Sequence, residues 1–145
     1  MLYIIVNKLS NVEIYAQGIY EDDSYKNAVS GTVLDHESGL FRKQHEFYLI
    51  SSNMKQGISL PCKYSIMYDS VGETMKKVQL LSYKLCYLYF NVGGPIRYPA
   101  PILYAHKLAN LVAEKNELDL INGPEREPIK VHEIFNQAGS TLFFI

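Results

Sequence analysis

Short apolar runs in the first half of the chain predict β-strands. The run Leu2–Val6 is continuously apolar, which is typical of a strand buried on both faces. Further strands are expected at Val12–Tyr15, Thr32–Leu34, Phe47–Ser51 and Tyr64–Tyr68. Polar residues dominate 17–30 and 39–44, which we expect to be connections. Because chain ends are usually solvated, a chain that opens on a core strand is expected to belong to a larger sheet.

Apolar residues in the second half recur at helical spacing instead. The first series predicts a helix over about residues 71–89: Val78, Leu81, Leu85 and Leu88. Ser70 and Glu73 have the spacing of a capping box at its start. A second helix is expected over 102–115, with Pro101 in its first turn. It is apolar on almost every side, so we expect it to be largely buried.

Composition narrows the class of protein. The 145 residues include 14 basic and 15 acidic side chains, for a net charge of -1, which argues mildly against autonomous nucleic-acid binding. Cys62 and Cys86 lack metal-ligand spacing and are interpreted as small buried residues. No apolar run approaches a membrane span and the start does not resemble a signal peptide. A soluble protein of the cytoplasm or nucleus is therefore expected, without membrane partners.

Five segments carry a more specific signal. In chain order they are GTVLD at 31–35, EFYLIS followed by QG between 46 and 57, YSIMYD at 64–69, LSYKLC at 81–86, and PAPILYAHKLA at 99–109. Their order and spacing resemble the C-terminal part of the PIWI domain of Argonaute and Piwi proteins, and are nearer to the Piwi clade. The resemblance runs from about Leu2 to Ala113, and the terminal LFFI also fits it.

The resemblance implies a fold and a role. The fold is α/β, the C-terminal half of an RNase H-like fold with a mixed sheet and two main helices, and 1–145 is a partial PIWI domain without an internal boundary. The implied function is small-RNA-guided gene silencing. The alternative is a catalytically dead PIWI-like remnant that binds RNA or protein. An unrelated α/β enzyme has little support, because the sequence contains no nucleophile–base pair, P-loop or dinucleotide fingerprint.

His106 matches the last metal ligand of the family, which is an RNA-guided endoribonuclease. Cleavage by two divalent ions needs several hard oxygen ligands, and the family's acidic ligands precede the segment that this chain resembles. Asp35 matches the structural GT-x-x-D position, so it is not assigned as a ligand. Mg²⁺ or Mn²⁺ is therefore expected only in the complete domain, and the chain alone is expected to be inactive. From helical geometry alone, a lone histidine such as His106 is more often a core residue.

Contacts to RNA are also implied by the resemblance. Lys8, Arg97 and the terminal carboxylate of Ile145 match positions near the guide strand, although each cation could equally be an ordinary surface charge. Leu9 and Glu13 replace basic residues of the Argonaute clade, which weakens the expectation of tight guide binding. The expected partners are guide and target RNA, the N-terminal PIWI half, the MID domain and Trp-bearing peptides.

Overall fold

The computed structural model describes residues 1–16, 26–39, 44–54 and 57–122, and its side chains as far as Glu114. The chain separates into two compact units, Met1–Ala100 and Pro101–Ile145, and each is described by itself. Whether the whole chain forms one domain without an internal boundary stays a prediction.

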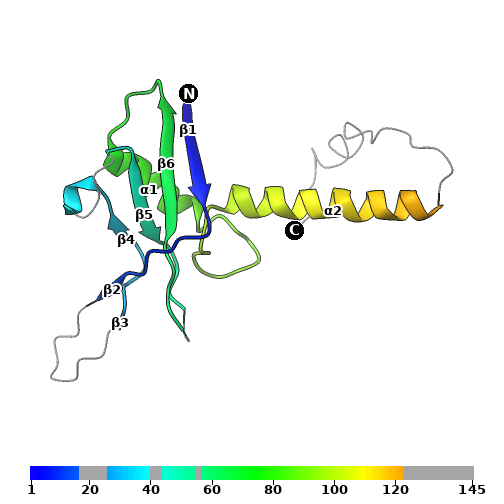
Figure 1. Cartoon of the computed structure of the whole chain (residues 1–145), viewed down its shortest axis with the longest axis horizontal. Helices are drawn as coiled ribbons and strands as arrows, with labels where there is room; N and C mark the ends of the chain where they lie inside the picture. The colour runs from blue at the N-terminus through cyan, green and yellow to red at the C-terminus, as the bar shows by residue number, and fades with distance from the viewer. Residues whose placement is uncertain (17–25, 40–43, 55–56, 123–145) are drawn as a thin grey trace. The chain divides into compact units, whose positions relative to one another are not determined.

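The first unit is built on a four-stranded antiparallel sheet with the order β1-β6-β5-β4 (Figure 1). The strands are β1 (Leu2–Asn7), β4 (Thr32–Leu34), β5 (Glu46–Ile50) and β6 (Cys62–Asp69). The α/β class is confirmed, and every pairing among the described strands of this sheet is antiparallel. β6 lies between β1 and β5, so residues early in the chain lie next to residues 62–69.

Two short strands form a separate pair. β2 (Tyr15–Ala16) and β3 (Lys26–Asn27) are antiparallel. The strand expected at Val12–Tyr15 therefore begins at the last predicted residue, and β3 occupies part of the stretch interpreted as a connection. A strand of two residues is too short to show an alternation of apolar and polar positions, so the sequence pattern cannot predict it. The rest of that connection, 17–25, lies outside the described residues.

The core of the unit lies between the sheet and α1 (Met75–Leu85). Phe47 on β5 and Tyr64 on β6 are fully buried, and their rings stack at 4.7 Å between centroids. Val78 of α1 packs into the same cluster. Cys62 and Cys86 are also fully buried, which confirms their interpretation as small core residues.

β1 is buried on one face only, so the prediction that both its faces are buried was wrong. Leu2, Ile4 and Val6 pack against the core, whereas Tyr3 and Ile5 are 51% and 45% exposed. Helix α1 lies against one face of the sheet (Figure 1). Within the described part of this unit, no element covers the other face of β1.

α1 begins four residues later and ends four residues earlier than predicted. The later start follows from the partners of Ser70 and Glu73. The Ser70 amide donates to the Met1 carbonyl at 3.0 Å. The Asp69 carboxylate accepts the amides of Val71 and Gly72 at 2.8 and 3.0 Å, which holds this segment as a turn. Thr74 is the N-cap residue, and Glu73 pairs with a lysine one turn further on.

The described part of the second unit is one helix, α2 (Ala100–Asn122, whose first residue belongs to the first unit), drawn without interruption in Figure 1. It is longer than the predicted 102–115. The prediction of a largely buried helix was wrong for residues 101–114, which are half-buried or exposed. α2 is the one described element of this unit. No helix in the described ranges is long and apolar enough to cross a membrane.

Candidate nucleic-acid interface

Lys8 and Arg97, two of the predicted RNA-binding residues, meet in the first unit. Lys8 follows β1, and Arg97 precedes α2 by three residues. Nη2 of Arg97 donates a hydrogen bond to the main-chain carbonyl of Lys8 at 2.8 Å, across 89 residues of sequence. The fold therefore brings two positive charges to one corner of the sheet. We call the residues Lys8, Arg97 and Tyr98 the basic corner.

Core hydrogen bonds hold the main chain at the basic corner. The Ser51 hydroxyl lies 2.8 Å from the Ile96 carbonyl and 2.6 Å from the Arg97 carbonyl. The buried Cys62 thiol donates to the Arg97 carbonyl at 3.4 Å. On the other side, the Ile96 amide donates to the Cys86 carbonyl at 2.9 Å. Because these partners are buried, the segment that carries Arg97 is fixed to the core.

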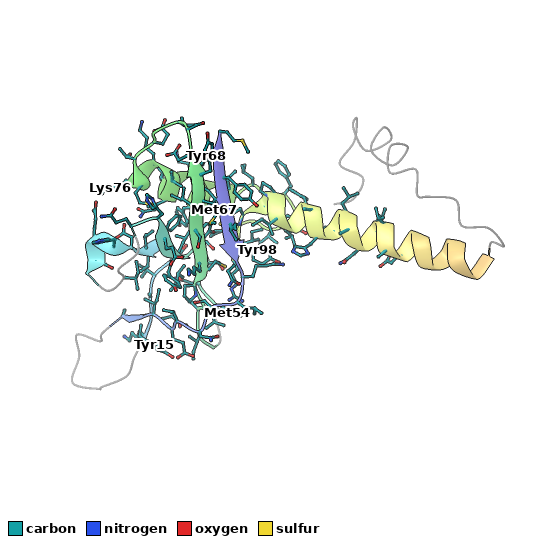
Figure 2. All side chains as sticks on the ribbon, turned by 45° about the horizontal axis from the view of Figure 1, so that its top comes forward. Tyr15, Met54, Met67, Tyr68, Lys76 and Tyr98 are labelled. Carbon is teal, nitrogen blue, oxygen red and sulfur yellow. The ribbon has the colours of Figure 1, made fainter. Side chains whose placement is uncertain are left out.

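Tyr98 completes the corner. Nζ of Lys8 lies 4.9 Å from the centroid of the Tyr98 ring, within the range of a cation–π interaction. The ring is half-buried, packs against the core cluster and lies beside β1 (Figure 2). Sequence reasoning missed Tyr98, since only its position next to Arg97 in the chain could have indicated a role.

The electrostatics of the buried layer reflect both cations. Burial raises the pKa of the Cys62 thiol, while the charges of Arg97 and Lys8 oppose that rise. Nε of Arg97 is buried and has no hydrogen-bond partner among the described residues. The guanidinium is therefore partly withdrawn from water, where a further anionic partner would be stabilised more than at an open surface.

Other charges near the corner are balanced. Lys63 on β6 is the register partner of Asn7 and forms an ion pair with Glu46 at 3.0 Å. Leu9, beyond Lys8, is 81% exposed and adds no charge. The corner is thus a small positive site rather than part of a broad basic face, in keeping with the net charge of -1.

An acidic cavity occupies a different part of the unit. It has a volume of about 260 Å³ and is lined by Asp35, His36, Glu37, Gln44 and Met75. The Asp35 carboxylate accepts from the Gln79 amide at 2.6 Å and caps the short 3-10 helix His36–Ser38. Asp35 therefore has structural partners, and the acidic lining would repel a phosphate backbone.

His106 lies in the second unit, on an exposed part of α2 between the exposed Ala105 and the half-buried Lys107. Its proposed role as a metal ligand needs further ligands. Within the described ranges, no three or more His, Cys, Asp or Glu side chains lie where they could hold a metal ion. The described residues do not fit a complete metal site. Ile145, the third predicted RNA-binding residue, lies outside the described residues.

Comparison with known proteins decides the family. The family model described as the Piwi domain matches residues 1–117. The chain belongs to the Piwi domain family. It is 39% identical over 114 residues to the Piwi-like protein Ago3 of Bombyx mori, a match that covers 79% of this chain and 12% of that protein. This confirms the resemblance deduced from the sequence motifs, including the Piwi clade.

Solved structures support the Piwi-type fold. The crystal structure of Drosophila Piwi matches with a TM-score of 0.62 and 35% identity, over 77% of this chain and 14% of that one. A structure of Kluyveromyces polysporus Argonaute with a guide RNA matches with a TM-score of 0.58 and 23% identity, over 75% and 13% of the two chains, and so shows a shared fold. The C-terminal RNase H-like fold class is confirmed. The chain spans about one eighth of the length of these proteins.

Proposed function

We propose that this Piwi-domain chain contributes RNA contacts to a protein of small-RNA-guided gene silencing, in the cytoplasm or nucleus. The observation that carries the proposal is the meeting of Lys8 and Arg97 at the basic corner. The family's motifs predict both residues as guide contacts, and the fold brings them into contact. Two adjacent cations on a fixed main chain suit a phosphodiester, whose oxygens accept charge-assisted hydrogen bonds.

The proposed partners of the corner are guide RNA and its paired target. The Argonaute structure that shares this fold contains a guide RNA, and we extend that partner to this chain. The Ile145 carboxylate is proposed to lie near the guide 5′ end, at the junction with a MID domain. We propose His106 as one ligand of a divalent-ion site in a complete PIWI domain, with Mg²⁺ or Mn²⁺ as the ion. Bound there, the ions would supply Lewis-acid activation of the cleaved phosphate.

Titrating the purified chain with fluorescein-labelled single-stranded RNA at several salt concentrations tests the RNA contact. Binding should be weak, and Lys8→Ala or Arg97→Ala should each reduce the slope of log affinity against log salt by about 0.7. Lys76→Ala is the matched control, because Lys76 is a lysine on α1, set apart from Tyr98 in Figure 2. Slopes unchanged by both corner variants would refute the proposal.

The chain by itself is expected not to cleave RNA, because one histidine cannot assemble a two-ion site. A guide and a fluorescent matched target are incubated with the purified chain and either Mg²⁺ or Mn²⁺. We expect the target to stay intact. Guide-dependent cleavage that disappears in His106→Ala would show that the chain assembles a complete site.

A protein-binding module is the second candidate, and exposed apolar side chains favour it. They lie on α1 and in the segment that follows it: Leu80, Leu81, Tyr87, Leu88, Phe90 and Val92. Exposed apolar surface often marks interaction sites where it forms a continuous patch. Trp-bearing peptides are the proposed partners. Binding of such a peptide, lost in Leu81→Lys but kept in Lys8→Ala, would support this candidate over RNA contact.

A further inference from the structure

We propose that Tyr98 is a positioning residue that holds the Lys8 ammonium ready for an RNA phosphate, a role that rests on the RNA contact proposed for Lys8 and Arg97. The family motifs did not point to this tyrosine. Its role comes from three contacts that meet at the basic corner.

The two ends of Lys8 are held separately. Its main-chain carbonyl accepts the Arg97 guanidinium at 2.8 Å, and its ammonium lies over the Tyr98 ring at 4.9 Å. A lysine side chain otherwise samples many rotamers and loses that freedom on binding. An ammonium already placed over a ring loses less of it, so the phosphate contact becomes stronger without any additional charge.

The ring is a firm support because its own backbone is fixed. The preceding carbonyl, that of Arg97, lies 2.6 Å from the Ser51 hydroxyl. The following residues, Pro99 and Ala100, are buried, and the ring itself packs against the core cluster. Tyr98 therefore cannot swing away from Lys8 without disturbing the core.

An ammonium carries three N–H donors, so a contact with one ring does not use up its capacity to donate to a phosphate oxygen. The Arg97 guanidinium, which bonds the Lys8 carbonyl, has a planar fork that suits phosphate oxygens. Tyr98 thus sets the direction of one cation, while the Arg97 side chain fixes the main chain from which that cation extends.

A double-mutant cycle tests the positioning role on the full chain, with fluorescein-labelled single-stranded RNA as the probe. Tyr98→Leu should weaken binding about two- to fivefold, the range of an exposed cation–π interaction, while Tyr98→Phe should bind like the unchanged chain. The salt slope should stay the same in Tyr98→Leu, because the number of neutralised phosphates does not change. In a Lys8→Ala background, Tyr98→Leu should have no further effect.

The outcomes separate this inference from the proposed function. Equal losses from Tyr98→Leu with and without Lys8 would show a purely structural role and overturn the inference, leaving the RNA contact intact. Unchanged binding in both Lys8→Ala and Arg97→Ala would overturn the RNA contact and the inference together. An NMR spectrum of the unchanged chain gives a test that does not depend on the folding of any variant. In it, the Tyr98 ring should shift the Lys8 Cε protons upfield. Random-coil shifts there would also overturn the inference.

Discussion

At the scale of a single residue, Ser51 connects the core to the basic corner. Its side chain is buried, and its hydroxyl lies within hydrogen-bond distance of the carbonyls of Ile96 and Arg97. A hydroxyl has one proton to donate, so it serves one of these carbonyls at a time. Without it, the Arg97 carbonyl keeps, among the described residues, only the weaker Cys62 thiol as a donor.

Ser51→Ala should therefore lower the free energy of unfolding by about 1–3 kcal/mol, the cost of a buried polar group that loses its partner. It should also weaken RNA binding, because the Arg97 main chain loosens. Urea denaturation measures the first effect. Ser52→Ala, at the neighbouring half-buried position, is the control and should change stability by less than about 0.5 kcal/mol. Equal losses for the two variants would remove the special role of Ser51.

Stability should fall as the pH rises through 9.0, the ordinary pKa of a thiol. Burial raises the pKa of Cys62 and Cys86 in the folded chain, and it raises that of the Tyr64 hydroxyl far above its usual range. Above the unfolded-state values the unfolded chain releases these protons and the folded chain keeps them. The folded state then binds more protons, so its stability decreases with pH.

The thermal midpoint measured at a series of alkaline pH values tests this. In a Cys62→Ala/Cys86→Ala double variant, the decrease should be shallower, because two of the groups responsible are gone. A double variant with the full slope would mean that the buried thiols do not contribute.

At the scale of elements, the start of α1 shows how local signals compete. The Ser70-to-Glu73 spacing matches a capping box, yet Ser70 bonds the chain start and the turn at Val71–Gly72 moves the first helical residue to Met75. Gly72 adopts a positive φ of 68°, which glycine tolerates without steric cost. Thr74 is therefore the N-cap residue, and its side chain forms no capping hydrogen bond.

Replacing Thr74 by Asp should stabilise the chain by about 0.5–1 kcal/mol, through an amide-capping bond and a favourable charge at the helix N-terminus. No acidic residue lies in the first turn of α1, and the charge of the neighbouring Glu73 is paired with Lys77 at 2.9 Å. Thr74→Ala should be nearly neutral, since it removes no capping bond. Thr74→Asn can form the hydrogen bond but carries no charge, so it separates the two contributions. The urea midpoints of the variants, at an unchanged m-value, measure the differences in stability. A Thr74→Asp variant less stable than the unchanged chain would contradict the prediction.

At the scale of the whole molecule, the exposed side of β1 is the feature that bears on self-association. Among the described strands β1 pairs only with β6, so it is an edge strand of the described sheet. Leu2–Asn7 has no charged side chain, and Tyr3, Ile5, Met67 and Tyr68 are exposed on β1 and β6. Uncharged edges with apolar neighbours readily pair with further strands.

The purified chain is therefore expected to self-associate, and Ile5→Lys should shift it towards monomer by placing a charge at the edge. Light scattering after size exclusion, at several concentrations, reports the mass. Val29→Lys adds the same charge at another exposed apolar position and should leave association unchanged. Addition of the N-terminal half of a PIWI domain should also reduce association. A monomer whose Ile4 and Ile5 amides are strongly protected from hydrogen exchange would contradict this prediction.

The sequence by itself determined the family, the α/β class and most strand positions. β4 was predicted at its observed bounds, and β5 and β6 within a few residues at each end. These strands could be predicted because a local run of apolar residues marks a buried strand whichever segments surround it. The GT, PAP and YAH motifs identified the Piwi domain through local spacing. Lys8 and Arg97 were selected in the same way, as isolated positions, and the sequence contained no sign that they touch.

The tertiary structure alone decided which distant segments became neighbours. The sheet order places β6 beside β1, and core hydrogen bonds from Ser51 and Cys62 hold the segment that carries Arg97. Lys8 thereby meets Arg97 and lies over Tyr98, across about 90 residues of sequence. The tertiary structure also decided that β1 is buried on one face, because α1 lies against one face of the sheet. The periodicity of apolar and polar residues reports which face of a single segment is buried. It does not report which other segment packs there, because that depends on the whole fold.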